Sequence, residues 1–535
     1  MYSMADNERL DAIVVGAGFA GLYMLYRLRG MGLKVQVLEA GGDVGGTWYW
    51  NRYPGARCDV ESLEYSYQFS EALQQEWSWS ERYAAQPEIL RYVRHVADRF
   101  DLKRDIRFDT RVQAAIFDDA AAAWTVTTEA GDRLHARWCI MATGCLSMPT
   151  TPEIKGAENF AGAIYHTGNW PHGGVDFTGL RVGVIGTGSS AIQSIPVIAE
   201  QAEQLYVFQR TPNFSVPAQN APMDRALEAR VKANYADFRA RNAGMQSAFG
   251  ARHPRNEGSA LEATAEEREA QYSHHWRIGG LLFLRAFGDL LTNPEANETA
   301  QEFVREQIRR TVHDRETAEK LLPDSVVGCK RLCADSGYFE TFNRPNVTLV
   351  DIRAEPLECI TEAGIRQGGL EHALDALVYA TGFDAMTGAL NRIDIRGRNG
   401  ASLREKWAAG PRTYLGLQVA GFPNLFTITG PGSPSVLTNM LFSIEQHVEW
   451  IADCIAYLRD RDLTVIEAAE EAETAWVAHV NEMAGQTLFT HCNSWYLGAN
   501  VPGKPRVFMP YLGFPDYVAR CNEVVAGGYE GFVLR

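Results

Sequence analysis

Two glycine-rich turns in this sequence have the residue types and spacing that bind the phosphates of dinucleotides. The first is Gly16-x-Gly18-x-x-Gly21 and the second is Gly186-x-Gly188-x-x-Ala191. In such a turn the first glycine permits a tight bend, the second lets a pyrophosphate approach the backbone, and the third position allows close helix–strand packing. The pyrophosphate then lies at a helix N-terminus, where free N–H groups favour anions. The sequence therefore predicts two dinucleotide sites in one chain.

The residues that follow the two turns differ in charge. Glu39 stands where an acid can bind ribose hydroxyls, whereas the equivalent place after the second turn holds Arg210. An arginine there suits the extra 2′-phosphate of NADP, although a plain surface arginine is the alternative. Hydride transfer to a flavin commonly pairs NADPH with FAD. We therefore assign FAD to the first turn and NADPH to the second.

Predicted strands and helices place both turns in βαβ units. A strand over residues 12–15, a helix over 19–29 and a strand over 34–38 surround the first turn, and strands over 181–185 and 205–209 surround the second. Short strands over 112–117, 124–128 and 133–141 predict a β-meander. A strand over 374–379 and an amphipathic helix over 445–458 follow. The expected fold class is α/β, with two Rossmann-like dinucleotide-binding domains and a helical insertion.

Composition narrows the class of protein. The chain has 535 residues, 46% hydrophobic and 22% charged, which predicts several globular domains rather than a disordered or coiled-coil chain. With 51 Lys and Arg against 66 Asp and Glu, the net charge of −15 disfavours nucleic-acid binding. Residues 1–10 do not resemble a signal peptide, and no apolar run is long enough to cross a membrane. We expect a cytoplasmic protein without a membrane partner, and its oligomeric state is left open.

Nine cysteines are scattered along the chain without any Cys-x-x-Cys pair. Cys329 and Cys333 are four residues apart, and we interpret them as buried thiols rather than as metal ligands. Cys58 stands beside Asp59, but nothing near it in sequence activates a thiol, so we expect a structural role. The cysteine pattern predicts reduced thiols and no metal site.

Further motifs resemble the two signatures of the type I Baeyer–Villiger monooxygenases. They are Phe160-x-Gly162-x-x-x-His166-x-x-x-Trp170-Pro171 and, upstream, Gly45-Gly46-Thr47-Trp48 with Tyr53-Pro54-Gly55 and Asp59. The resemblance continues through residues 186–193, 330–331, 381–384, 430–440 and 494–504, and it is nearest to the phenylacetone and steroid types. It implies an NADPH-dependent flavoprotein that uses a C4a-peroxyflavin to insert one oxygen atom of O₂ next to a ketone carbonyl, giving an ester or lactone.

The resemblance also implies roles for individual residues. Arg331 would be the catalytic arginine, paired with Asp59, because a guanidinium keeps its proton and presents fixed donors to a developing oxyanion. The expected FAD contacts are Gly16, Gly18, Phe19, Gly21, Glu39, Gly46, Thr47, Trp48, Asp59, Tyr65, Val112 and Met440. The expected NADPH contacts are Thr187, Gly188, Ser189, Ser190, Gln193, Arg210, Thr211, Lys330, Arg331 and Trp495.

The remaining expected site residues belong to the linker signature and to the substrate pocket. Phe160, Gly162, His166, Trp170 and Pro171 would couple the domains, with His166 acting in domain motion more than in chemistry. The ketone pocket would be lined by Cys145, Leu146, Ser435, Val436 and Leu437. Cys145 departs from the amide side chain of the phenylacetone type, which puts the substrate profile in doubt but leaves the reaction unchanged.

The predicted order of domains is discontinuous. Residues 1–145 and 382–535 form the FAD domain, residues 146–216 and 324–381 form the NADP domain, and residues 217–323 form the helical insertion. Two Ala-Thr-Gly tripeptides, at 142–144 and 380–382, mark strand-end turns beside a nucleotide or a domain crossing. The alternatives are a flavin monooxygenase that oxygenates amine nitrogen or sulfide sulfur, a disulfide reductase, which would need a redox dithiol, and a nucleotide sensor without activity.

Overall fold

The computed structural model describes residues 10–535, so the prediction about a signal peptide lies almost entirely outside the described residues. An eight-stranded sheet begins the fold, with the strand order β17-β4-β5-β6-β1-β2-β3 and with β18 also pairing β6. Its strands are β1 (Leu10–Val15), β2 (Val35–Leu38), β3 (Ile106–Arg107), β4 (Val112–Asp118), β5 (Ala123–Thr128), β6 (Arg133–Met141), β17 (Asp394–Arg396) and β18 (Leu425–Thr427). Strands β4, β5 and β6 pair antiparallel, which confirms the predicted meander.

A second sheet is parallel throughout and has the order β12-β9-β8-β16-β7. Its strands are β7 (Ala163–His166), β8 (Arg181–Ile185), β9 (Gln204–Gln209), β12 (Val347–Asp351) and β16 (Ala376–Tyr379). Smaller pairings join β10 (Ser215–Pro217) to β11 (Cys333–Asp335), β13 (Leu357–Ile360) to β14 (Gly364–Gln367) and β15 (Leu370–Ala373), and β19 (Ile466–Ala468) to β20 (Phe532–Leu534). The two α/β sheets confirm the predicted fold class.

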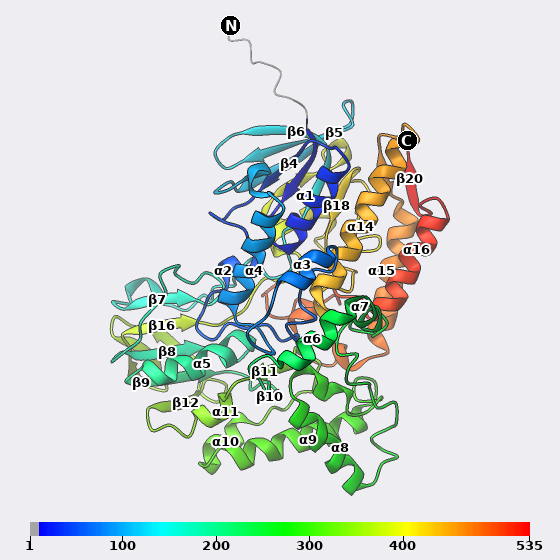
Figure 1. Ribbon diagram of the computed structural model, residues 1–535. Coiled ribbons are helices and arrows are strands. Elements are labelled where there is room, and N and C mark those ends of the chain that lie inside the picture. The colour runs from blue at the N-terminus through cyan, green and yellow to red at the C-terminus, as the bar shows by residue number, and fades with distance from the viewer. Residues whose placement is uncertain (1–9) are drawn as a thin grey trace.

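Helices cover the first sheet and fill the space between chain segments. The helices that follow the first glycine turn in the chain are α1 (Phe19–Gly30), α2 (Thr47–Trp50), α3 (Glu71–Glu76) and α4 (Gln86–Arg99). Later in the chain come α5 (Ser189–Gln201), α11 (Tyr338–Thr341), α12 (Gly388–Arg392), α13 (Leu403–Lys406), α14 (Met440–Arg459), α15 (Glu470–Gly485) and α16 (Phe514–Ala526). Helix α14 packs along α1, and Figure 1 shows α14, α15 and α16 on one side of the molecule.

Residues 218–323 form helices and contain no strand in the described chain. They are α6 (Arg225–Ala233), α7 (Tyr235–Ala243), α8 (Ala265–Ile278), α9 (Pro294–Thr311) and α10 (Arg315–Leu321). Figure 1 shows α8, α9 and α10 at the end of the molecule opposite the first sheet. After residue 382, β17 and β18 return to the first sheet, where they pair with β4 and β6, and the division of the chain into domains stays a prediction.

Helix α14 differs from the amphipathic helix expected over residues 445–458. It starts earlier, at Met440, because the Asn439 side chain accepts a hydrogen bond from Leu441 N (3.1 Å) and caps the helix. Two of its polar residues are also buried, since Glu445 accepts hydrogen bonds from Gln68 N (2.8 Å) and Phe69 N (3.1 Å), and His447 accepts one from Thr429 N (2.9 Å). The helix is therefore a core element whose polar side chains bind backbone groups.

Candidate active site

The first glycine turn packs so closely that side chains are excluded from it. Gly16 has φ +106°, and a Cβ there would lie 2.5 Å from the carbonyl oxygen of Ala142. A Cβ on Gly21 would lie 1.8 Å from the Gly16 carbonyl oxygen, so helix α1 can approach β1 only with glycine at this position. Helix α1 has no side-chain cap on Gly18 and no acidic residue in its first turn. Its N-terminal N–H groups therefore face a space suited to an anion.

The second turn repeats this arrangement. Gly186 has φ +125°, and a Cβ there would lie 2.3 Å from the carbonyl oxygen of Ala380. Helix α5 begins after Gly188, again without a side-chain cap or an acid in the first turn. Each Ala-Thr-Gly tripeptide thus begins at the residue that packs against the first glycine of a dinucleotide turn. These strand ends therefore lie beside the two glycine turns, and their place beside a nucleotide stays a prediction.

Glu39 follows β2 and holds the backbone of the first turn. Its carboxylate accepts hydrogen bonds from Ala17 N (2.6 Å) and Gly41 N (2.7 Å), and the residue is 5% exposed. Burial raises the pKa of Glu39, while the two backbone donors lower it in part. Gly46 packs directly against the first turn, because a Cβ on it would lie 2.9 Å from the Cα of Gly18.

Among the other expected FAD contacts, Trp48 and Phe19 both contact Tyr65. Trp48, on α2, is buried, and its Nε1 donates to the Tyr65 hydroxyl (3.2 Å). Phe19, the first residue of α1, packs edge-on against Tyr65 with ring centroids 5.7 Å apart. The remaining expected contacts are Thr47 at the start of α2, Val112 at the start of β4 and Met440 at the start of α14.

Arg331 and Asp59 form a bidentate ion pair, although they are 272 residues apart. The Arg331 Nε and Nη2 donate to the two carboxylate oxygens of Asp59, each at 2.9 Å, and Nη1 donates to the carbonyl oxygen of Val436 (2.8 Å). The two side chains are 21% and 28% exposed. Burial lowers the pKa of the guanidinium, but the Asp59 carboxylate and the nearby Tyr496 phenol outweigh burial and raise it above its ordinary value. The guanidinium is therefore fixed, charged and partly accessible.

The thiol next to this pair, that of Cys58, has a raised pKa. Burial is the main cause that raises the pKa of Cys58, and the neighbouring Asp59 carboxylate raises it further. A thiol that stays protonated is a poor nucleophile. This supports the structural role expected for Cys58.

The expected NADPH contacts surround the start of α5. Thr187 donates to the carbonyl oxygen of Thr211 (2.6 Å), and the Ser189 hydroxyl lies 3.2 Å from the Cys333 sulfur. Ser190 is hydrogen-bonded to Thr167 (3.1 Å). The second turn is therefore hydrogen-bonded to the residues after β9, to β11 and to the segment before β8.

Gln193 joins helix α5 to the FAD-type domain. Its side chain accepts a hydrogen bond from the Tyr53 hydroxyl (2.8 Å) and donates one to the carbonyl oxygen of Arg57 (3.1 Å). Gly55 lies directly on the helix, since a Cβ there would be 2.2 Å from the Gln193 carbonyl oxygen. The Tyr53-Pro54-Gly55 motif thus packs against helix α5, which follows the second glycine turn.

Arg210 is exposed at the end of β9 and lines an open cavity of about 780 Å³. The cavity also contains Arg353 and residues of α10, among them Arg315 and Lys320. Burial lowers the pKa of Lys330, and the Asp324 carboxylate raises it. The charges of Arg210 and Arg353 lower it further, so Lys330 lies close enough to both arginines to interact with them. The lining of the cavity also contains the acids Asp314, Glu316, Glu319 and Asp351, so the cavity carries both charges, and the role of Arg210 toward a 2′-phosphate stays a prediction.

His166 of the linker signature contacts both chain segments that run between the two large sheets. His166 ends β7, and its Nε2 lies 3.2 Å from the carbonyl oxygen of Thr150 and 3.2 Å from the hydroxyl of Thr381. Its Nδ1 accepts from Gly168 N (2.9 Å), and burial lowers its pKa, so the ring is neutral with its proton on Nε2. Trp170 is buried, and Phe160, Gly162 and Pro171 lie on the same linker.

Two of the expected substrate residues, Cys145 and Ser435, contact Met386. The Met386 N–H donates to the carbonyl oxygen of Cys145 (2.8 Å), and the Ser435 hydroxyl lies 3.9 Å from the Met386 sulfur. Val436 and Ser435 are buried, whereas Leu146 and Leu437 are partly buried and pack against the same core. The carbonyl group of Val436 also holds Arg331, so the structure brings the pocket segment and the arginine together.

One expectation about the cysteines is wrong. Cys329 is not a free thiol, because it forms a disulfide with Cys492 across 163 residues, whereas the other seven cysteines are free. The sequence carries no spacing signal for this pair, since the packing of two loops brings the residues together. The cytoplasmic location that we expected in part from reduced thiols stays a prediction.

Tyr496 was also missed, although it directly follows Trp495. It is 1% exposed, and it lies close enough to Arg331 for the guanidinium to lower its pKa, which burial raises. Its neighbour Trp495 is only partly buried, as a side chain that meets a ligand can be. No pattern distinguishes this tyrosine from a core aromatic residue.

The residues fit FAD and NADP at the two turns, since both are cradles that a Cβ would fill and both leave helix N-termini free for a pyrophosphate. Across residues 10–535, every helix is too short or too polar to span a lipid bilayer.

Comparison with known proteins identifies the same regions. Residues 13–254, which include both glycine turns, match the family described as pyridine nucleotide-disulphide oxidoreductase. Three curated relatives are each 42% identical. They are a phenazine N-monooxygenase from Lysobacter antibioticus (99% of this chain and 98% of the relative), a Baeyer–Villiger monooxygenase from Pseudooceanicola batsensis (98% and 96%) and a cyclohexanone 1,2-monooxygenase from an Acinetobacter species (99% and 98%).

Solved structures match over nearly the whole chain. An oxidized steroid monooxygenase bound to NADP is 55% identical, with a TM-score of 0.94 and coverage of 98% of this chain and 99% of that one. The complex of OTEMO with FAD and NADP is 41% identical, with the same TM-score and the same coverage.

Proposed function

Because the chain belongs to the Baeyer–Villiger monooxygenases, flavoproteins that use FAD and NADPH to insert an oxygen atom next to a ketone carbonyl, we propose that Arg331 is its catalytic arginine and Asp59 the partner that orients it. The observation that carries this proposal is the bidentate pair between them. It fixes a permanent cation where the two dinucleotide-binding parts of the chain meet.

The number of donors on Arg331 explains how it can serve the reaction. A guanidinium has five N–H donors. Asp59 accepts two of them and the Val436 carbonyl oxygen accepts one. The two remaining donors can stabilise the negative charge developing on an oxygen atom of the reacting ketone, without any reorganisation of the side chain. When bound, the two cofactors supply the hydride and the activated oxygen.

Arg210 and Lys330 supply the charge that would select NADPH over NADH. Arg210 lines the open cavity at the end of β9, and Lys330 lies close enough for the two charges to interact. Thr187, Ser189 and Ser190 stand at the start of α5, where the pyrophosphate is expected. Trp495 would cover the coenzyme from the C-terminal loop.

The pocket composition favours ketones with apolar substituents. Cys145, Leu146, Val436 and Leu437 offer no charge, and the Ser435 hydroxyl donates to the Ser433 carbonyl oxygen (3.2 Å). A pocket of this kind binds through apolar contact and leaves orientation to Arg331. The relatives that act on cyclohexanone and acetone by name agree with such a substrate class.

An Arg331→Ala variant tests the catalytic role. We expect it to bind FAD and to oxidise NADPH, but to form no ester from a panel of cyclic and aryl ketones. Arg181→Ala is the matched control, because Arg181 makes a similar bidentate pair with Asp375 (2.9 and 2.7 Å) at the opposite end of the parallel strands. Ester formation at the normal rate by Arg331→Ala would overturn the assignment.

Isotope labelling tests the origin of the inserted atom. Under ¹⁸O-labelled oxygen gas, the ester is expected to gain one heavy oxygen atom, and under labelled water it should gain none. Label from water would show that hydrolysis, not oxygen insertion, supplies the atom.

Nitrogen oxygenation is the second candidate function. A phenazine N-monooxygenase is as similar in identity as the ketone-oxidising relatives. The two activities separate by product, because an N-oxide retains the substrate skeleton whereas an ester contains a new C–O bond within it. Incubation with a phenazine and with a cyclic ketone, followed by mass spectrometry, distinguishes them.

A further inference from the structure

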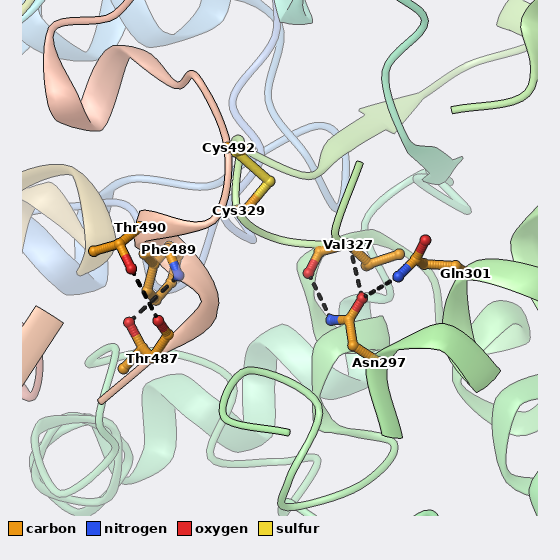
Figure 2. Close-up of a disulfide and its surroundings, with 8 residues drawn as sticks. All are labelled: Asn297, Gln301, Val327, Cys329, Thr487, Phe489, Thr490 and Cys492. Carbon is orange, nitrogen blue, oxygen red and sulfur yellow. Dashed lines mark hydrogen bonds between the residues drawn. A yellow bond between two sulfur atoms is a disulfide. The ribbon is translucent and has the colours of Figure 1, made fainter. Parts of the chain in front are cut away.

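Two loops that are distant in sequence meet on the helical insertion. The arginine loop, residues 327–333, follows the insertion, and the C-terminal loop, residues 488–504, follows helix α15. The disulfide Cys329–Cys492 joins them across 163 residues, with Cα atoms 6.1 Å apart (Figure 2). The disulfide therefore connects two parts of the chain that each carry expected coenzyme contacts.

The arginine loop is fixed to helix α9 at its first residue. Asn297, on α9, is completely buried, and its side chain donates to the Val327 carbonyl oxygen (3.0 Å) and accepts from Val327 N (3.0 Å), as Figure 2 shows. The next residue, Gly328, has φ +88°, and a Cβ there would lie 2.7 Å from a side-chain carbon of Leu291. Cys329 follows directly and is completely buried. One half of the disulfide is thus held in the interior of the protein.

The C-terminal loop begins on the same segment of the insertion. Leu488 N donates to the carbonyl oxygen of Leu291 (2.8 Å), the residue whose side chain lies against Gly328. Phe489 N donates to the Thr487 hydroxyl (3.4 Å), which caps a short 3-10 turn before Cys492 (Figure 2). The disulfide therefore joins two segments that packing on Leu291 already brings together.

Ser494 organises the part of the C-terminal loop that follows Cys492. Its carbonyl oxygen accepts hydrogen bonds from Leu497 N (3.1 Å) and Ala499 N (3.0 Å). Ser494 is 2% exposed, and its hydroxyl has no hydrogen-bond partner within the protein, although buried hydroxyl groups normally have one. The next residue is Trp495, which is only partly buried. This segment therefore presents a polar group and an aromatic ring suited to a ligand.

We propose that Cys329–Cys492 is a redox-sensitive site, which holds Ser494 and Trp495 in the position that binds the coenzyme and which a dithiol reductant opens. The proposal rests on the coenzyme roles proposed for Lys330 and Trp495. Lys330 directly follows one half-cystine and Trp495 stands three residues after the other, so the disulfide fixes both contacts relative to each other. After reduction, the arginine loop keeps its place on α9, but the C-terminal loop loses its covalent connection nearest to Trp495.

The two sulfur atoms differ in their access to a reductant. Cys329 is completely buried, whereas Cys492 is partly exposed. A thiolate of the dithiol therefore attacks Sγ of Cys492, which breaks the S–S bond and releases Cys329 as a thiolate that takes up a proton. The second thiol of the reagent then displaces Cys492 and closes a cyclic disulfide. The reagent is oxidised by two electrons, and the protein gains two thiols.

Coenzyme binding measures the effect of reduction. Titration calorimetry of the FAD-loaded protein with NADP⁺ should give a Kd about fivefold higher after dithiol treatment, as when the binding position of the loop falls to about one fifth of the molecules. Cys492→Ser should show this raised Kd with or without the dithiol. Cys359→Ser, which removes a free cysteine outside both loops, is the matched control and should respond as the parent protein does. An unchanged Kd in fully reduced parent protein would overturn the proposal.

Limited proteolysis follows the C-terminal loop itself and needs no turnover. Chymotrypsin cleaves after large apolar residues, and Trp495, Tyr496 and Leu497 stand side by side in this loop. We expect cleavage there to be faster in reduced protein than in oxidised protein, and we expect NADP⁺ to slow it. Equal cleavage rates in the two redox states would show that the disulfide does not hold the loop.

Peptide mapping tests the disulfide, and ester formation separates this proposal from the proposed function. In protein denatured without reductant, Cys329 and Cys492 should be found in one linked peptide, and alkyl groups on both would overturn the proposal. If the parent protein binds NADP⁺ and forms ester, but reduction changes neither Kd nor cleavage, the redox role is wrong and the proposed function stands. If the parent protein does not bind NADP⁺, the proposed coenzyme contacts fail first, and the role of the disulfide fails with them.

Discussion

Replacement of Asp59 by asparagine separates the charge of the pair from its shape. Asparagine keeps the size of the side chain and one acceptor oxygen, so the variant loses one of the two hydrogen bonds to Arg331 and the opposite charge. A hydrogen bond to a charged group contributes about 1.5–3 kcal/mol. Since the two side chains are 21% and 28% exposed, solvent screens part of this energy. We take about 2 kcal/mol as the loss.

If that energy orients Arg331 for the reaction, the variant loses about 30-fold in the rate of ester formation, because about 1.4 kcal/mol corresponds to tenfold. Single-turnover measurement of ester, with FAD content and flavin reduction followed in parallel, isolates this step. Asp375→Asn is the matched control, because Asp375 makes the same type of bidentate pair with Arg181. A normal ester rate in Asp59→Asn would refute the orienting role, and equal losses in both variants would indicate a general effect on stability.

Three further predictions concern the coenzyme, the flavin turn and the core. Arg210→Ala should lower the preference for NADPH over NADH in kcat/KM by more than tenfold and weaken binding of NADP, whereas Arg315→Ala, on the same cavity, should retain both. Gly16→Ala should purify without flavin, as measured by visible absorbance, because its Cβ would meet a carbonyl oxygen at 2.5 Å, while Gly30→Ala meets nothing within 4 Å and should keep its flavin. Burial raises the pKa of Glu445 to about 7. The folded state therefore binds this proton more tightly than the unfolded chain, and the stability from it is present below pH ~4.5 and lost as the pH rises through about 7, by at most about 3 kcal/mol. In urea titrations across this range, Glu445→Gln should remove that decline, and an identical pH dependence in variant and parent would contradict the assignment.

Short-range features of the site were predictable because glycine turns act locally. The turn at Gly16 and its repeat at Gly186 follow from spacing, since each needs only a strand, a bend and the next helix. The polarity of the next strand end, Glu39 or Arg210, is also local. These features were enough to predict two dinucleotide sites and the α/β fold.

Long-range pairs were not predictable from pattern. Arg331 and Asp59 were paired only through the resemblance to a family, because 272 residues separate them and packing alone brings them together. The disulfide Cys329–Cys492 was not predicted for the same physical reason, because neither spacing nor composition indicates which loops will be in contact. Periodicity also missed the burial of Glu445, because its partners are backbone N–H groups in a distant loop.

The interdomain contacts explain why the site depends on the whole chain. Gln193 binds the loop that leads to Asp59, and His166 lies between the two linkers. On the C-terminal loop, Lys504 donates to Asp384 (2.6 Å) and Asn500 donates to the Phe383 carbonyl oxygen (2.7 Å), so this loop is held against the second linker. Arg331 stands where these connections converge, and a displacement of either domain must alter at least one of its contacts. We therefore expect the direction of the guanidinium to depend on the relative position of the segments that these contacts hold together.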